Sequence, residues 1–290
     1  MSLTLYRTSA FPNKNSGGNE AGVVLDATRI DDSQMLSIAK RVNFSETAFV
    51  FPSTKADYKL RYFSPTVEVP LCGHATIATF NLMRNLDMLD KTHYTIETNE
   101  GILDVYIEPT QVVMQLKKPK FLDIIDKATI TKKLGIPEED MIDAPIQVVT
   151  TGIKEIFMGV KSLDILHNLD LDIDAIKTLA QTVDATGLYI YTLETKEGND
   201  AQGRNFIPMV GIAEESATGT ASGALACYLN KYLLKDQTTF TFEQGYALYK
   251  PSLINAKINL TQDTVTDVYV GGTMRLIDKI VGFMPETEDA

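Results

Sequence analysis

Glu46 combines a reactive side chain with an informative position in the chain. It begins an apolar run, Glu46 to Phe51, that follows a helical pattern. Alternation along a strand places it on one face with Ala48 and Val50. A carboxylate on a largely apolar surface loses hydration, which raises its pKa and makes it a competent base near neutral pH. Composition alone would favour an exposed strand glutamate, so the pattern leaves both readings open.

His74 lies in a small-residue turn that occurs twice. The first copy reads RYFSP and then LCGHAT, and the second reads RNFIP and then ATGTAS, with Gly73 and Gly219 separated by 146 residues. Each turn leads into a helical pattern. The helix dipole disfavours a charged imidazolium at a helix start, which leaves a neutral ring able to donate or accept a proton. The alternative is a surface or capping histidine.

This repeat predicts a duplicated half-domain, with two helix N-termini suited to an anion. Many short alternating apolar runs surround few helical patterns. We therefore predict an α+β fold of two pseudo-symmetric halves, each a curved, mainly antiparallel sheet around a central helix. The expected N-terminal half is 1–115 plus about 275–290, and the C-terminal half is 116–274. The helical patterns are Ser33 to Val42, His74 to Leu86, Ile130 to Leu134, Asp174 to Thr182 and Thr220 to Leu234.

Composition excludes several classes of protein. The chain has 290 residues, 44% of them hydrophobic, and a net charge of −11. Nucleic acids and anionic membranes need basic patches that are missing here, and no apolar run is long enough to span a bilayer. Two cysteines give no disulfide framework, and three scattered histidines lack metal-ligand spacing. We expect a cytoplasmic protein without a metal, and a mobile segment at Thr195 to Gly203 that is a candidate lid.

Four blocks carry a resemblance to a known family. The segments SETAFV, RYFSPTVEVPLCGHAT, RNFIPMVGIAEESATGTASGALACYL and QGYALYKPS resemble signature blocks of the PhzF-type phenazine-biosynthesis family, which shares the diaminopimelate-epimerase-like fold. The resemblance spans positions 11 to 272. It implies a homodimer with the active site in a cleft between the halves. It also implies cofactor-free isomerisation, in which a glutamate moves a proton between carbons of trans-2,3-dihydro-3-hydroxyanthranilate, a small carboxylate.

The resemblance also assigns roles to residues. Glu46 matches the proton-shuttling glutamate and His74 its assisting histidine, while Glu215 stands where the family usually has an aspartate that helps to polarise the substrate. The extra methylene moves that carboxyl by about an ångström, and such a shift can lower a rate ~100-fold, which puts the phenazine precursor itself in doubt as substrate. The expected substrate-binding residues are Asn19, Ser45, Gly73, Gly219 and Thr220.

Cys72 suggests other functions. It stands at the first of the two thiol positions that related racemases use, but the repeat places Thr218 at the second. Because a threonine hydroxyl forms no thiolate-like base near neutral pH, a two-thiol racemase is disfavoured. Two alternatives remain, a non-catalytic small-molecule-binding homologue and an epimerase that uses Cys72 alone.

Overall fold

The computed structural model describes residues 3–283 and divides into two compact units. Unit 2 is Leu116–Val270, and unit 1 is formed by the residues on both sides of it. Two strands cross the boundaries of the units, at residues 115/116 and 270/271, and each lies mostly in one unit. Unit 1 contains β1 (Leu3–Ala10), β2 (Asn19–Val24), α1 (Asp32–Val42), β3 (Glu46–Phe51), β4 (Tyr58–Phe63), β5 (Glu68–Val69), α2 (Gly73–Asn85), β6 (His93–Thr98), β7 (Gly101–Ile107), β8 (Val112–Leu116) and β18 (Met274–Phe283). Unit 2 contains β9 (Lys120–Ile125), α3 (Lys127–Leu134), β10 (Ile146–Thr150), β11 (Lys154–Gly159), α4 (Leu163–Asn168), α5 (Ile173–Thr182), β12 (Gly187–Thr192), β13 (Ala201–Ile207), β14 (Ile212–Glu215), α6 (Gly219–Tyr232), β15 (Thr239–Gln244), β16 (Ser252–Thr261) and β17 (Thr264–Gly272), with short 3₁₀ turns at Glu138–Asp140, Pro208–Val210 and Tyr246–Leu248.

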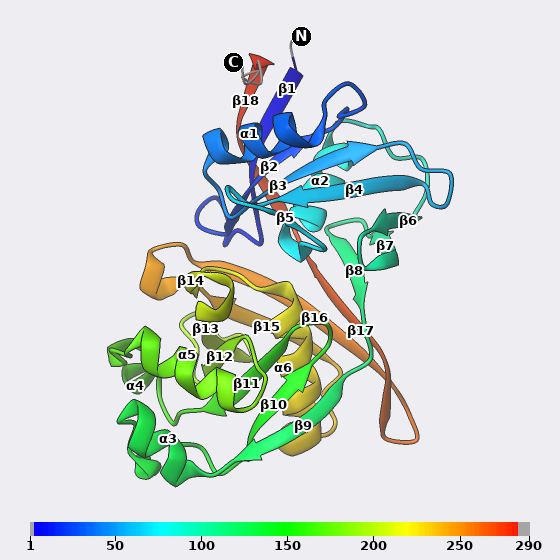
Figure 1. Ribbon diagram of the computed structural model, residues 1–290. Helices are drawn as coiled ribbons and strands as arrows, with labels where there is room; N and C mark the ends of the chain where they lie inside the picture. The colour runs from blue at the N-terminus through cyan, green and yellow to red at the C-terminus, as the bar shows by residue number, and fades with distance from the viewer. Residues whose placement is uncertain (1–2, 284–290) are drawn as a thin grey trace. The chain divides into compact units, whose positions relative to one another are not determined.

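Both units are built on the same strand ladder (Figure 1). In unit 1, β1 pairs antiparallel with β18 and β2, β2 runs parallel to β3, and β3 is antiparallel to β4. The other edge of β4 carries β5 antiparallel and β6 parallel. Unit 2 repeats the pattern with β9, β10, β11, β12 and β13, followed by β14 and β15. The predicted α+β fold of two pseudo-symmetric halves is therefore confirmed.

Each unit contains an arginine–glutamate bridge at the same place in its strand ladder. Arg61 on β4 donates from Nε and Nη2 to Glu68 on β5 at 2.8 and 2.7 Å. Arg204 on β13 donates to Glu214 on β14 at 3.0 and 2.8 Å with the same two nitrogens. A bidentate pair fixes orientation as well as distance. Each bridge therefore holds the short strand that leads into the central helix of its unit.

The central helices α2 and α6 are almost completely buried and begin in the same way. The residues preceding them, Cys72 and Thr218, have extended backbones, and neither side chain caps the helix. In each helix a hydroxyl one turn later, from Thr76 or Ser222, donates to the carbonyl of that preceding residue, at 2.7 and 2.9 Å. The first-turn amides of a helix lack intrahelical acceptors, so both helix starts present N–H groups.

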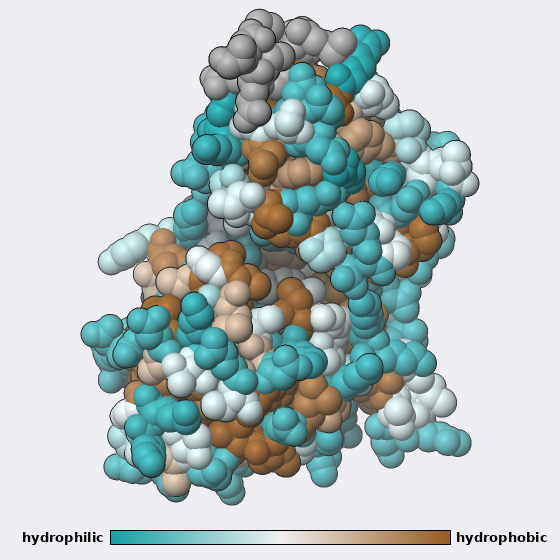
Figure 2. Space-filling view, viewed as in Figure 1, coloured by the Kyte–Doolittle hydropathy of each residue, from teal (hydrophilic) through white to brown (hydrophobic). Residues whose placement is uncertain are grey.

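Shorter helices cover the outer faces. α1 starts with a capping box between Asp31 and Gln34 and packs Met35 and Ile38 against the apolar face of β3. In unit 2, α3, α4 and α5 bury a separate apolar cluster, and the surface that they leave is a mixture of hydrophilic and hydrophobic residues (Figure 2). Among residues 3–283, no helix has the length and apolar character needed to cross a membrane.

The prediction of a mobile segment at residues 195–203 is wrong for its last three residues. Residues 201 to 203 belong to β13, and the preceding loop is tied down by the fully buried carboxylate of Glu243 on β15. That carboxylate accepts from the backbone amides of Lys196 and Glu197, both at 2.9 Å, and from Asn199 Nδ2 at 2.8 Å. No local pattern indicates this anchor, because Glu243 is more than 40 residues away along the chain.

Glu243→Gln should loosen this loop. The amide group would direct a donor at backbone N–H groups that need an acceptor, and hydrogen bonds to a charged group contribute about 1.5–3 kcal/mol. We expect the free energy of unfolding in urea to fall by about 2 kcal/mol and limited proteolysis between residues 195 and 199 to accelerate. The exposed control Glu139→Gln should change neither. Unaltered proteolysis in Glu243→Gln would mean that the anchor does not hold the loop.

Candidate functional site

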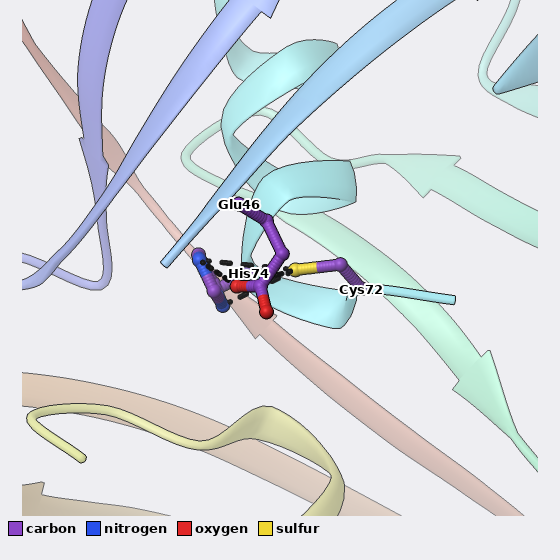
Figure 3. Close-up of side chains that lie close together, drawn as sticks. All are labelled: Glu46, Cys72 and His74. Carbon is purple, nitrogen blue, oxygen red and sulfur yellow. Dashed lines mark hydrogen bonds and ion pairs between the residues drawn. The ribbon is translucent and has the colours of Figure 1, made fainter. Parts of the chain in front are cut away.

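Three side chains of unit 1 meet at the start of α2, and we call them the Glu46 cluster. Glu46 is the first residue of β3, while Cys72 immediately precedes α2 and His74 lies in its first turn. Figure 3 shows the three side chains pointing toward one another. His74 Nε2 lies 3.4 Å from Glu46 Oε2, and the Cys72 thiol donates to the same oxygen at 3.6 Å. The fold thus brings together the two residues that were predicted as catalytic in this half.

Neighbouring polar groups orient the His74 ring. The Asn19 side-chain nitrogen lies 3.3 Å from Nδ1, and the Ser45 hydroxyl lies 3.3 Å from Nε2. When the Asn19 amide donates to Nδ1, the neutral ring carries its proton on Nε2. That proton then faces the Glu46 carboxylate. Asn19 and Ser45, both predicted to bind substrate, therefore contact the histidine.

Burial changes the acidity of Glu46. Only 15% of its side chain is exposed, against 6% for His74. Loss of hydration raises the pKa of Glu46, and hydrogen bonds from Ser45 and Cys72 oppose part of the rise. The predicted direction is confirmed. A carboxyl with a raised pKa takes up a proton more readily near neutral pH than an exposed glutamate does.

The Glu46 cluster also has the composition of a metal site. One donor atom from each of Glu46, Cys72 and His74 lies within 4.8 Å of the other two. Contacts among the three side chains account for the same proximity, since the thiol donates to the carboxylate and the imidazole lies 3.4 Å from it. The sequence-based expectation of no metal remains a prediction.

A second polar cluster lies at the corresponding place in unit 2, and we call it the Thr218 cluster. The Thr218 hydroxyl donates to Glu215 Oε2 at 2.6 Å, and its amide donates to Gln244 Oε1 at 3.2 Å. Gln244 Nε2 donates to the Glu215 carbonyl at 2.8 Å, and Asn205 Nδ2 donates to Thr218 Oγ1 at 3.0 Å. Glu215, the third predicted catalytic residue, is thus held by the residue that occupies the position of Cys72 in the repeat.

The Thr218 cluster reaches a buried acid that the sequence reading missed. Asn205 Nδ2 also donates to Glu155 Oε1 at 3.2 Å. Burial is the largest influence on Glu155 and, with the nearby charge of Glu215, raises its pKa to about 8, while the Asn205 hydrogen bond opposes the shift. The signal was present, because Glu155 is a lone acid in the apolar run EIFMG.

The predicted carboxylate-binding residues begin the two central helices. Gly73 is the first residue of α2, and Gly219 and Thr220 are the first two of α6. The Thr220 carbonyl accepts from the Thr151 hydroxyl at 2.9 Å, which fixes the first turn of α6 to the end of β10. These positions can present backbone amides to an anion, as helix N-termini do.

Comparisons with known proteins agree with this architecture. The family model described as phenazine biosynthesis-like protein matches residues 8–277. An uncharacterized isomerase of Clostridium acetobutylicum is 32% identical over 95% of this chain and 96% of its own length. The uncharacterized isomerase YfhB of Bacillus subtilis is 34% identical over 88% of this chain and 90% of its own.

Solved structures of PhzF-family proteins and of an epimerase share the fold of this chain. The phenazine biosynthesis protein of the PhzF family from Bacillus anthracis superposes with a TM-score of 0.89, at 29% identity, over 98% of this chain and 100% of its own. A hydroxyproline epimerase from Agrobacterium vitis shares the fold at a TM-score of 0.60 and 10% identity, over 98% of this chain and 93% of its own. Because the family model and full-length relatives agree, the chain belongs to the phenazine biosynthesis-like family of PhzF-type proteins.

Proposed function

We propose that the protein is a cofactor-independent isomerase that moves a proton between carbons of a small, unsaturated, carboxylate-bearing substrate similar to trans-2,3-dihydro-3-hydroxyanthranilate. The observation that carries this proposal is the Glu46 cluster, in which a largely buried carboxylate contacts an oriented imidazole. The designation of full-length relatives as isomerases supports the same reaction class.

In this proposal Glu46 is the base that collects and returns the proton. Because the pKa of its carboxyl is raised, Glu46 binds a proton more readily near neutral pH than an exposed glutamate does. His74, whose Nε2 proton faces Glu46, orients this carboxylate and helps to polarise the polar groups of the substrate. Because Asn19 holds the other ring nitrogen, the ring needs no reorientation during the reaction.

The remaining residues bind and polarise the substrate. We propose that backbone amides at Gly73, Gly219 and Thr220 hold its carboxylate and that Glu215 contacts its polar groups. Helix N-termini suit this role because their amides and dipole both favour negative charge. The proposal includes the homodimer that the family resemblance implies.

One contact favours a second candidate, an epimerase that uses Cys72. The thiol is 3.6 Å from Glu46 Oε2 and 3.4 Å from His74 Nδ1, so either group could accept its proton. A thiolate formed in this way would be a base able to attack a C–H bond. The repeat nevertheless supplies no second thiol, because Thr218 occupies the matching position.

Cys72→Ser distinguishes the two candidates. If Glu46 is the base, we expect the serine variant to keep its turnover within about threefold, because the hydroxyl can still donate to the carboxylate. If Cys72 is the base, turnover should fall by at least ~100-fold. The measurement is the rate of product formation, with Cys227→Ser as the control for loss of a buried thiol.

Proton NMR in D₂O tests the proposed function. The protein is incubated with a panel of small amino and hydroxy acids, including the dihydroanthranilate. We expect deuterium at carbon, or a new isomer, with at least one substrate. Ligands that bind without any exchange would instead favour the non-catalytic binding homologue.

A further inference from the structure

Glu155 on β11 has no part in the reaction proposed above. It is nevertheless among the most deeply buried acidic residues of the described part of the chain. Its exposure is 1%. Asn205 Nδ2 donates to Oε1, while Oε2 has no hydrogen-bond partner among residues 3–283. The strand continues as Ile156 and Phe157, which are fully buried apolar residues. Because a buried oxygen without a partner destabilises a fold, packing alone would favour an apolar residue here.

A directional chain of hydrogen bonds leads from Glu155 to Glu215. Asn205 Nδ2 donates to Glu155 and also to Thr218 Oγ1, the latter at 3.0 Å. Gln244 Nε2 adds a second donor to Thr218 Oγ1 at 3.3 Å. Because both contacts occupy lone pairs of the hydroxyl, its single proton points to Glu215 Oε2, 2.6 Å away. Glu155 holds the Asn205 amide in place, and the Asn205 amide in turn sets the direction of the Thr218 hydroxyl.

We propose that Glu155 is a positioning residue that anchors the Asn205 amide and thereby fixes the Thr218 hydroxyl on the carboxylate of Glu215. The Thr218 hydroxyl then holds the Glu215 carboxylate in one orientation. This inference rests on the proposed role of Glu215 and adds the means by which that residue is held. We call Glu155, Asn205, Thr218 and Glu215 the Glu155 chain.

The surroundings of Glu155 favour its uncharged form. The facing residue on β10 is Val149, the nearby titratable group on β12 is Tyr189, and the charge that acts from β14 is that of Glu215. The apolar surroundings and the charge of Glu215 disfavour a second buried negative charge, and Tyr189, a neutral phenol, supplies no compensating cation. The cations on the two strands that carry Glu155 and Asn205 are engaged in other ion pairs, Lys154 with Asp184 and Arg204 with Glu214.

Two substitutions in the full-length protein test the charge and the anchor separately. In Glu155→Gln, the carbonyl oxygen still accepts from Asn205 and the side chain stays neutral. In Glu155→Leu, the acceptor is lost at similar volume. Hydrogen exchange followed by mass spectrometry reports on the start of α6 without any substrate. We expect amides in residues 216–220 to exchange about tenfold faster in Glu155→Leu and at the wild-type rate in Glu155→Gln.

A matched control separates this effect from general loosening of unit 2. Gln202 on β13 is 1% exposed and lies outside the Glu155 chain, and its Oε1 also has no partner among the described residues. We expect Gln202→Leu to leave exchange in residues 216–220 unchanged. Equal acceleration in Gln202→Leu and Glu155→Leu would overturn the positioning role.

Kinetics with a substrate identified by deuterium exchange give the second readout. We expect kcat/KM to fall ~10- to 100-fold in Glu155→Leu, to recover in Glu155→Gln, and to fall no further when Thr218→Val is added to Glu155→Leu. Independent residues would multiply their losses, which would contradict a shared chain. A damaged Glu155→Gln would also overturn the proposal, because it would show that the acid must be charged.

The two proposals fail differently. If wild-type protein exchanges no substrate, the proposed isomerase is wrong, while hydrogen exchange still decides whether Glu155 holds the start of α6. If turnover is lost in Glu46→Gln but all Glu155 variants behave as wild type in both readouts, the isomerase stands and the positioning role is wrong.

Discussion

Glu46→Gln should abolish deuterium incorporation at carbon while the protein stays folded and still binds its ligand. The amide keeps the size of the side chain and can still contact His74, but it cannot take up a proton. Removal of a general base typically lowers a rate by ~10²–10⁴-fold. Turnover is measured by NMR in D₂O, and ligand binding is measured by calorimetry with the same substrate.

The exposed Glu139→Gln provides the control, because it changes one carboxylate to an amide away from the cluster. Its turnover should equal that of wild type. Normal exchange in Glu46→Gln would remove Glu46 from the mechanism. If Glu46→Gln exchanged normally and Cys72→Ser did not, the thiol would be the base instead.

Glu155→Gln should have the second large effect, on the dependence of stability on pH. The pKa of Glu155 is about 8 in the folded protein, against 4.5 for an ordinary glutamate. Between these values the folded chain retains a proton that the unfolded chain has lost, so Glu155 lowers wild-type stability as the pH rises from about 4.5 to about 8. Above pH 8 the loss is complete.

Urea unfolding of both proteins at pH 5 and pH 8.5 measures this effect. Because each pKa unit corresponds to ~1.36 kcal/mol, Glu155→Gln should gain roughly 4 kcal/mol relative to wild type between the two pH values. Glu139→Gln should run parallel to wild type over the same range. A parallel curve for Glu155→Gln as well would show that Glu155 is not an acid held in its protonated form.

The sequence predicted local features of the site and could not predict their meeting. Alternation after Glu46 was enough to indicate an apolar face, because side-chain direction along a strand depends only on local geometry. The contact with His74 depends on β3 lying beside the start of α2, and 28 residues separate the two side chains in the chain. No pattern within either segment encodes that distance.

The role of Glu155 was not predicted from the sequence, for a different reason. Glu155 stands in an apolar run just as Glu46 does, but none of the four blocks that resemble the family includes it. The anchor of the loop at residues 195–199 could not be predicted, because Glu243 lies on a distant strand. Polar residues such as those in this loop predict mobility only when no buried partner satisfies their backbone groups.

The pairing of β18 with β1 has a consequence for biosynthesis. Residues such as Thr8 and Leu276 are partners in that ladder, so unit 1 lacks this strand until the ribosome has passed residue 283. Unit 2 is continuous in sequence and has all of its strands earlier. Domains generally fold as units during synthesis. In this protein the order should be inverted, with unit 2 complete first and unit 1 incomplete until β18 has been synthesised.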